Sequence, residues 1–146
     1  EIAVLALGCF WGPEIKFSKI EGVIKTEVGY CGGNSPTTTY KEVCTGKTNH
    51  AEVVKIDFDE KIITYEKILK IFFQIHDPTT LNSQGPDFGT QYRSEIFYLN
   101  DNQRVVAERV LRDVDDRMSG KVVTKISLLK NYCPAEEYHQ KYLEKR

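Results

Sequence analysis

The chain has 146 residues, with 20 Lys or Arg and 21 Asp or Glu, so its formal net charge is −1. At this length about two-thirds of the unfolded surface can be buried in one core, and we expect residues 1–146 to form a single domain. The balanced charge argues against nucleic-acid and anionic-membrane partners. The apolar stretches are far too short for a membrane span, and no signal-peptide pattern precedes the first expected strand.

The cysteines stand at positions 9, 31, 44 and 133, without a Cys-x-x-Cys pair among them. This spacing suits neither a zinc knuckle nor a small disulfide scaffold. We therefore expect free thiols, a reducing and cytoplasmic compartment, and no bound metal.

The first expected element is a strand over residues 2–7, which are apolar on both alternating faces. This pattern is typical of a strand buried on both sides, although periodicity alone does not exclude a helix. Pro13 then indicates a helix over about 13–20, with Pro at its first position. Residues 23–30 alternate as a half-buried strand, and residues 51–58 predict a further strand.

The next segments predict a helix, a long loop and a strand. Thr64 is a candidate N-cap for an amphipathic helix whose apolar stripe reaches Ile75. Residues 77–90 are interrupted by Pro, Gly and Asn, and a loop this long is usually functional or mobile. Residues 94–99 predict a short strand.

The last expected elements are a helix and a strand. Asp101 is read as the cap of a helix that ends at Gly120, and residues 122–129 predict the final strand before an irregular tail. Strands alternate with helices, and some strands follow one another directly. This order indicates α/β or α+β with helices packed on a sheet, and the pattern does not choose between them.

Cys9 lies where the first strand turns into the first helix, between Gly8 and the pair Phe10-Trp11. A lone cysteine is more often a small buried apolar residue than a reactive one. The turn and the positive end of the helix nevertheless favour a thiolate here, and we expect a reactive thiol. Phe10 and Trp11 fit two roles equally well, as core aromatics or as an apolar wall that receives a methyl group.

Glu52 is the most informative residue outside this turn. By strand alternation it shares the face of Val54, Ile56 and Phe58. The simple alternative is an exposed position at the start of the strand. If the face is buried, loss of solvation raises the carboxyl pKa, and a carboxyl that stays neutral near pH 7 is a general acid.

The remaining polar candidates are less specific. His50 falls on the opposite strand face from Glu52, so a Cys9–His50 nucleophile–base pair is disfavoured. His76 and His139 read as structural or solvated histidines. Tyr40, Asp87 and Tyr92 lie in loop regions, where polar residues often serve sites, but spacing alone assigns them no role.

Seven motifs along the whole chain together resemble a known family, the type A peptide methionine sulfoxide reductases. They occur in the family's order, and they are too long to match by chance. They are GCFWG at 8–12, GYCGG at 29–33, TYKEV at 39–43, HAEV at 50–53, HDP at 76–78, GTQYRS at 89–94 and PAEEYHQ at 134–140.

The resemblance implies a two-layer α/β (α+β) sandwich with a ferredoxin-like core and long wrapping coils. It implies reduction of methionine-S-sulfoxide, free or in peptides and proteins, to methionine. Carried over by motif, Cys9 attacks the sulfoxide sulfur and Glu52 protonates the oxygen. Tyr40 and Tyr92 hydrogen bond that oxygen.

The same resemblance implies a substrate pocket. Phe10 and Trp11 wall it for the substrate methyl group, and Asp87 helps to anchor the substrate. No bound cofactor is expected, and we expect a monomer. The remaining rivals are a Cys9–His50 hydrolase or transferase and a non-catalytic methionine-binding module.

The family chemistry leaves Cys9 as a sulfenic acid, which a second thiol must reduce. Many relatives carry resolving cysteines in a glycine-rich C-terminal tail, whereas this sequence has none after Cys133. Cys133 is therefore the first internal candidate, and Cys31 and Cys44 read as structural. Direct reduction by an external thiol, such as thioredoxin, glutaredoxin or dithiothreitol, is an equal expectation.

Overall fold

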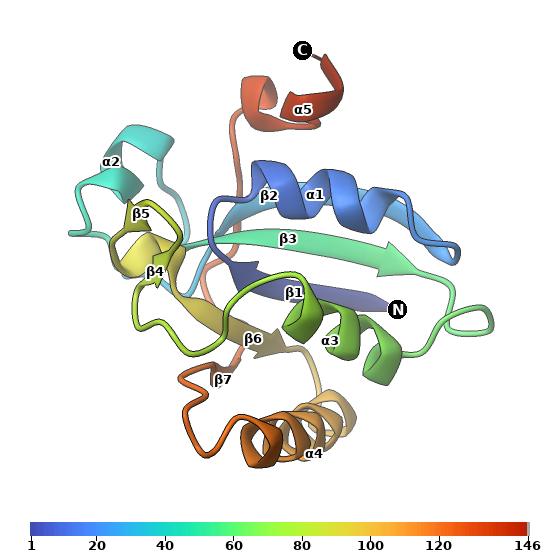
Figure 1. The fold of residues 1–146 in the computed structure, drawn as a ribbon. Coiled ribbons are helices and arrows are strands. Elements are labelled where there is room, and N and C mark those ends of the chain that lie inside the picture. Colours follow the sequence, from blue (N-terminus) through green and yellow to red (C-terminus); the bar gives the residue numbers. More distant parts are fainter. Residues whose placement is uncertain (146) are drawn as a thin grey trace.

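The computed structural model describes residues 1–145 and contains one large sheet with helices on one face (Figure 1). The strands are β1 (Ile2–Leu7), β2 (Val23–Cys31), β3 (Ala51–Phe58), β4 (Ser83–Gln84), β5 (Asp87–Phe88), β6 (Ser94–Tyr98), β7 (Lys125–Leu128) and β8 (Cys133–Pro134). The helices are α1 (Trp11–Ser18), α2 (Tyr40–Cys44), α3 (Tyr65–Gln74), α4 (Asp101–Arg117) and α5 (Tyr142–Lys145), with 3-10 turns at Thr90–Tyr92 and Glu137–His139.

The six-stranded sheet has the order β7-β6-β1-β3-β2-β8. Its four central strands are antiparallel to one another, and with α1 and α3 they follow the chain order β-α-β-β-α-β. This order is that of the ferredoxin-like motif, as expected. The parallel strand β7 extends one edge and the two-residue strand β8 the other. β4 and β5 form a separate hairpin.

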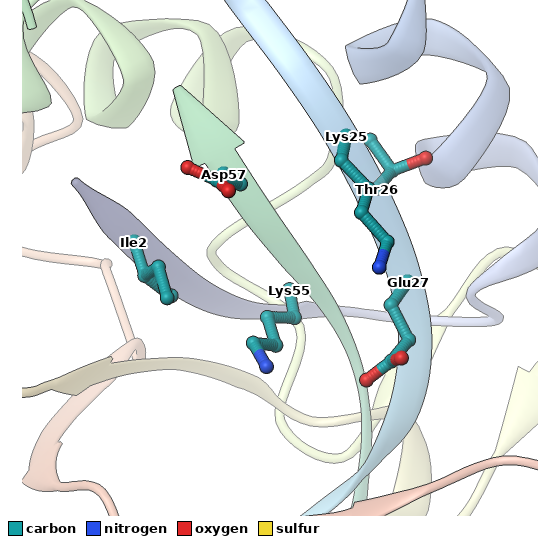
Figure 2. Close-up of a pocket in the computed structure, with 6 residues that line it drawn as sticks. All are labelled: Ile2, Lys25, Thr26, Glu27, Lys55 and Asp57. Carbon is teal, nitrogen blue, oxygen red and sulfur yellow. The ribbon is translucent and has the colours of Figure 1, made fainter. Parts of the chain in front are cut away.

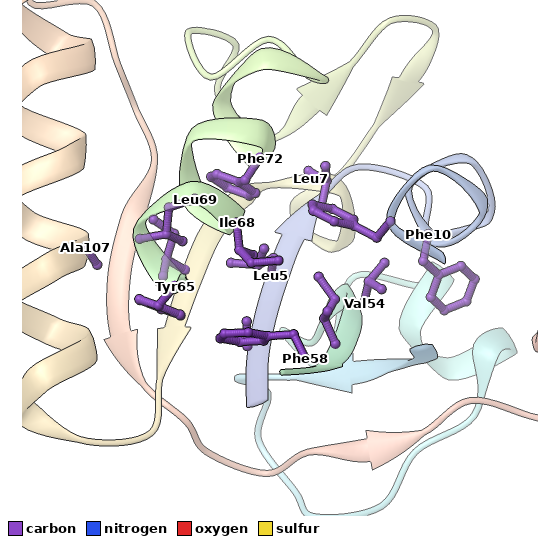
Figure 3. Close-up of a cluster of buried hydrophobic side chains, with 14 of the residues drawn as sticks. Leu5, Leu7, Phe10, Val54, Phe58, Tyr65, Ile68, Leu69, Phe72 and Ala107 are labelled. Carbon is purple, nitrogen blue, oxygen red and sulfur yellow. The ribbon is translucent and has the colours of Figure 1, made fainter. Parts of the chain in front are cut away.

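The main core lies between the helices and one face of the sheet (Figure 3). Strand alternation directs Leu5 and Leu7 of β1 and Val54 of β3 to this face, where Ile68 and Phe72 of α3 cover them. Burial of such apolar surface contributes about 25 cal/mol per Å² and stabilises the two layers. This face ends at the turn after β1, so the core fixes the position of that turn.

The second face of the sheet has no helix among the described residues. A smaller core of Val4, Ala6, Val53 and Phe97 is covered there by Leu129 and Tyr132 from the chain after β7. The coil then passes behind the sheet and returns to the helical side, where α5 lies beside α1 (Figure 1). Long coils therefore wrap the sheet, as expected from the family resemblance.

A small pocket also opens on the second face (Figure 2). Lys25, Glu27, Lys55 and Asp57 surround it together with Ile2 and Thr26. Asp57 lies near the end of β3, whereas Glu52 lies near its start and on the other face. This charged pocket is therefore separate from the site that contains Glu52.

Most expected elements are confirmed, with β3 at its expected bounds and Thr64 accepting a hydrogen bond from the Lys67 backbone N–H at 3.1 Å. Two helix starts were wrong. Trp11 rather than Pro13 begins α1, and Asn100 rather than Asp101 caps α4. The Asn100 side chain accepts from the Gln103 N–H at 2.9 Å, which is the capping geometry one position earlier.

The C-terminal part differs more from expectation. The strand expected over 122–129 is only Lys125–Leu128, and the tail adds β8, which pairs with β2. The helix α2 was expected as a loop. Among residues 1–145 no helix is long and apolar enough to cross a membrane.

Candidate active site

Cys9 lies in the turn that joins β1 to α1, and its thiol is partly exposed. The preceding Gly8 has φ of 96°, a conformation that residues with a Cβ rarely adopt. A Cβ at this position would lie 2.9 Å from the Cβ and Cγ of Gln84. Glycine is thus required for two reasons, and it brings the β4–β5 hairpin against the turn that carries the thiol.

The protonation state of Cys9 differs from the expected thiolate. Burial raises the pKa of the thiol to about 11 even though the Trp11 backbone N–H at the start of α1 acts in the opposite direction. The negative charges of Glu52 and Asp87 raise it further. The expected thiolate was wrong, because loss of solvation outweighs the single N–H donor at the helix end.

Glu52 occupies the buried face of β3 with 1% of its surface exposed. Its Oε1 accepts a hydrogen bond from the Phe10 backbone N–H at 3.3 Å, and Oε2 has no partner. Burial raises the pKa of this carboxyl to about 8, although the Phe10 N–H lowers it. The expected neutral carboxyl near pH 7 is therefore confirmed, and its free oxygen leaves room for another polar atom.

Tyr40, Asp87 and Tyr92 come from three segments, namely α2, β5 and the 3-10 turn at Thr90–Tyr92. Burial raises the pKa of Tyr92 to about 12, and the charges of Glu52, Asp87 and Cys9 contribute to the shift. The pKa of Tyr40 is also raised, first by burial and then by Cys44 and Glu52. The charge of Glu52 thus acts on both tyrosines, and that of Asp87 acts on Cys9 and Glu52.

The two aromatic residues after Cys9 have different surroundings. Phe10 is 1% exposed and packs in the main core, with its ring 5.8 Å from that of Tyr30 (Figure 3). Trp11 is partly exposed, and its indole stacks on Tyr142 of α5 at 4.0 Å between centroids. Of the two open roles, Phe10 thus resembles a core aromatic, whereas Trp11 presents a ring at the surface beside Cys9.

His50 immediately precedes β3, and its expected placement opposite Glu52 does not follow from alternation, because residues two positions apart share a strand face. Its Nε2 lies 2.8 Å from the Ser35 carbonyl oxygen, and its ring fills the space where a Cβ on Gly33 would stand. His50 thus has a structural role. Among residues 1–145 no group of three or more His, Cys, Asp or Glu could hold a metal ion.

The other three cysteines have different settings. Cys31 is buried, and its thiol donates to the Lys130 carbonyl oxygen at 3.2 Å. Cys133 lies in β8 with its thiol 3.7 Å from the Thr38 carbonyl oxygen. Cys44 is exposed at the end of α2, hydrogen bonds with Tyr40, and is among the groups whose charge acts on Cys9.

Two residues at the site were missed from residue types and spacing. Glu136 accepts the Tyr30 hydroxyl at 2.8 Å and the Tyr40 backbone N–H at 3.0 Å. His139 accepts a hydrogen bond from the Trp11 indole at 3.1 Å. Both lie in the motif at 134–140, which identified the family but gave no indication that the tail folds back onto α1 and α2.

A partly exposed thiol whose neighbour is a buried, neutral carboxyl is the arrangement of a thiol-dependent enzyme site. A family model described as peptide methionine sulfoxide reductase matches residues 1–146. "Peptide methionine sulfoxide reductase MsrA" of Pelagibacter ubique is 80% identical over 146 residues, which are 100% of this chain and 99% of that protein.

Solved structures agree with the family match. Mxr1 from Saccharomyces cerevisiae in reduced form has a TM-score of 0.95 and 41% identity, and the match covers 100% of this chain and 85% of that one. Mxr1 in complex with Trx2 has a TM-score of 0.70 and 26% identity, with 97% and 84% covered. The chain belongs to the peptide methionine sulfoxide reductase family, and its activity is the reduction of methionine sulfoxide.

Proposed function

We propose that residues 1–146 form one catalytic domain that reduces the S epimer of methionine sulfoxide, free or within peptides. One observation carries the mechanism, namely the buried Glu52 carboxyl beside Cys9, with a pKa raised to about 8 and a free Oε2. A sulfoxide oxygen is a poor leaving group until it is protonated. The site therefore needs a sulfur nucleophile and a neutral acid at the same time.

In the proposed reaction, the Cys9 Sγ attacks the sulfoxide sulfur while Glu52 donates its proton to the sulfoxide oxygen. This attack forms a sulfur–sulfur bond. The protonated oxygen then moves from the substrate sulfur to Sγ, the sulfur–sulfur bond breaks, and methionine leaves with that electron pair while Cys9 becomes a sulfenic acid. Glu52 takes up the proton that the Cys9 thiol loses. Both groups are protonated near pH 7, so one proton is transferred with the oxygen and one returns to the carboxyl.

Tyr40 and Tyr92 act in this proposal as hydrogen-bond donors to the sulfoxide oxygen. Burial raises the pKa of both phenols, and the neighbouring carboxyl raises it further, so both hydroxyls keep their protons. Hydroxyl donors directed at an oxygen that accumulates charge stabilise the transition state more than the bound substrate.

The proposed site distinguishes the two epimers of the substrate by three contacts around its sulfur. Its oxygen faces Glu52 and the tyrosines, its methyl group packs on Trp11 above the buried Phe10, and Asp87 anchors the side that continues into the substrate. A site with three different contacts binds one epimer of a chiral sulfur productively. The family resemblance makes this the S epimer.

The test is turnover of methionine-S-sulfoxide and methionine-R-sulfoxide with dithiothreitol as reductant. We expect the wild-type protein to release methionine from the S epimer alone, Cys9→Ser to be inactive, and Glu52→Gln to lose about 100-fold or more in kcat while still binding substrate. Cys31→Ser is the matched control and should keep its activity. Turnover by Cys9→Ser, or an unchanged kcat in Glu52→Gln at pH 7, would contradict the assignment.

We further propose that an external thiol reduces the sulfenic acid on Cys9. Cys9 is partly exposed, and a thioredoxin complex is known for the similar yeast protein Mxr1. A thioredoxin, a glutaredoxin or dithiothreitol would attack the Cys9 sulfur, expel water and form a mixed disulfide that a second thiol opens. Cys133 remains the internal alternative, and Cys44 is a second one because its charge reaches Cys9.

Mass spectrometry after one turnover without reductant distinguishes these routes. External resolution predicts a persistent Cys9 sulfenic acid, which dimedone traps in the wild type and equally in Cys133→Ser and Cys44→Ser. A disulfide from Cys9 to either residue in the wild type, lost in the corresponding Ser variant, would instead establish an internal route.

A further inference from the structure

His139 is the centre of an aromatic cluster next to the proposed active site. It is 1% exposed, although it lies only seven residues before the end of the chain. Its ring centroid lies 5.3 Å from that of Phe10, 5.7 Å from Trp11, 4.4 Å from Tyr40 and 4.2 Å from Tyr138. One side chain from the tail therefore touches the turn after Cys9 and the first residue of α2.

The hydrogen bond between Trp11 and His139 determines the protonation state of the imidazole. An indole N–H can only donate, so Nδ1 of His139 must accept and cannot carry a proton. The imidazole is therefore neutral, with its proton on Nε2, which has no hydrogen-bond partner. Burial favours this state by lowering the pKa of His139, although the charge of Glu136 acts in the opposite direction.

Two residues of the C-terminal tail contact the Trp11 indole. Tyr142 stacks on one face of the ring, and His139 holds the ring nitrogen. Stacking alone fixes the plane but allows a half-turn rotation about the Cβ–Cγ bond, which exchanges the ring edges, whereas a hydrogen bond to the ring nitrogen selects one of the two orientations. Trp11 follows Cys9 by two residues, so this rotation decides which ring edge faces a substrate at the thiol.

We propose that His139 is a positioning residue, which as a neutral hydrogen-bond acceptor fixes the Trp11 indole as the wall for the substrate methyl group. The inference rests on the proposed function, because it assigns the methyl group to Trp11. His139 acts on substrate binding through Trp11 and takes no part in the proton transfer at Glu52.

The proposal makes substrate binding depend on pH. A proton on Nδ1 replaces the acceptor by a second donor facing the indole N–H, and the bond is lost. The titratable groups around His139 are Tyr40 of α2, Glu136 and Tyr138 of the tail, and Tyr142 of α5 beyond Trp11. Of these, Glu136 favours the charged imidazole, so its carboxylate limits how far the pKa falls.

Two variants separate positioning from ordinary packing. His139→Leu keeps an apolar side chain in the cluster but removes the acceptor. His139→Asn places its side-chain oxygen close to the position of Nδ1 and cannot be protonated. We expect KM for methionine sulfoxide to rise about tenfold in His139→Leu with kcat within about twofold, and His139→Asn to restore most of the wild-type KM. Equal KM values in a folded His139→Leu variant and the wild type would overturn the proposal.

Trp11 is the only tryptophan of the chain, so its fluorescence reports on the same contact directly. As pH falls below the ordinary histidine range, the wild type should show a step in Trp11 emission, and His139→Asn should not. A step of equal size in His139→Asn would contradict the role of His139. This measurement needs neither turnover nor a folded Leu variant, so it distinguishes failure of this inference from failure of the proposed function.

A double-mutant cycle completes the test. Trp11→Phe removes the indole donor, so His139→Leu should raise KM much less in the Trp11→Phe background than in the wild type. Additive effects of the two substitutions on KM would show that His139 acts independently of Trp11 and would overturn the proposal.

Discussion

Glu52 is neutral at physiological pH because the fold places it in the core, and this same burial is a cost to stability. Its pKa is about 8 in the folded chain, against an ordinary value of 4.5 for a solvated glutamate. The unfolded chain therefore releases a proton that the folded chain retains, so the free energy of unfolding falls as pH rises from 4.5 towards 8. The residue proposed as the acid thus weakens the fold in the pH range where it works.

Glu52→Gln should accordingly stabilise the protein while it impairs catalysis. Glutamine can keep the acceptor for the Phe10 N–H and has no charge to desolvate. We expect the free energy of unfolding to rise by about 2 kcal/mol at pH 7, with the difference shrinking as pH falls towards 4.5. Urea unfolding of both proteins across this range measures it. A variant that is less stable than the wild type at pH 7 would show that the carboxyl is not destabilised by burial.

At the residue scale the sequence predicts best where strand alternation applies. Alternation placed Glu52 on the face of Val54, where its carboxyl accepts from the N–H of the core residue Phe10. It gave no valid placement for His50, which precedes β3 and by a period of two would share the face of Glu52. It could not predict the raised pKa of Cys9, because the balance between a helix end and burial depends on how the surrounding loops pack. The role of His139 likewise depends on a contact between residues 128 positions apart.

The β4–β5 hairpin and the turn after β1 position each other. Gly8 has a positive φ, and its missing side chain makes room for Gln84 of β4. Gln84 accepts a hydrogen bond from the Asp77 N–H at 3.0 Å, which ties the hairpin to the end of α3. The short hairpin thereby holds Asp87 of β5 near the thiol.

Gly8→Ala should therefore affect both stability and activity. The left-handed backbone and the close contact to Gln84 together predict a loss of about 2 kcal/mol in the free energy of unfolding. Displacement of the hairpin moves Asp87 and should lower kcat/KM about tenfold. The matched control is Gly12→Ala in the same pentapeptide. Its Cβ would meet nothing within 4 Å, and alanine is the better helix former inside α1. Chemical unfolding and steady-state kinetics of both variants test this contrast, and equal effects would contradict it.

Elements with local signals were predicted well, and elements created by long-range pairing were not. The apolar period of α3 and its Thr64 cap lie within the segment itself. By contrast, β8 is two residues long and exists because Cys133 and Pro134 pair with Tyr30 and Gly29 of β2. The helix α2 is five residues long, and a carboxylate of the tail accepts its first N–H. Neither feature has a periodic pattern in the sequence.

At the scale of the whole molecule, the chain after β7 connects the two faces of the sheet. It covers the second face with Leu129 and Tyr132, adds β8 at the sheet edge, and returns to the helical side. There Glu136, His139 and Tyr142 support the residues proposed to bind substrate. The ferredoxin-like core alone therefore carries Cys9 and Glu52, whereas the wrapping coil completes the walls around them.

A polar chain joins three parts of the molecule at the same end of the sheet as Cys9, where Ser94 pairs with Leu7, and makes the fold sensitive to acid. His76 follows α3, and its Nδ1 lies 2.6 Å from the Phe72 carbonyl oxygen, so Nδ1 carries the proton of the neutral ring. Its Nε2 then accepts from the Ser94 hydroxyl at 2.7 Å, and Ser94 in turn accepts from Thr124 at 2.7 Å. A second proton on His76 would make Nε2 a donor, so the Ser94 and Thr124 hydroxyls would have to reverse their donor and acceptor roles.

Stability should therefore fall as pH decreases through this group. Burial lowers the pKa of His76 from 6.5 to about 4. The unfolded chain gains a proton below pH 6.5 that the folded chain does not accept until about pH 4, so up to about 3 kcal/mol of stability is lost across this window.

His76→Gln has no titrating group and should lose less stability over the same window, whatever its stability at pH 7. Urea unfolding at pH 7, 5.5 and 4.5 measures the difference in slope. Glu52 acts in the opposite direction but equally in both proteins, so it cancels from the comparison. If the free energy of unfolding fell equally with pH in both proteins, the pKa of His76 would not be lowered by folding. The assigned donors and acceptors of this chain would then be incorrect.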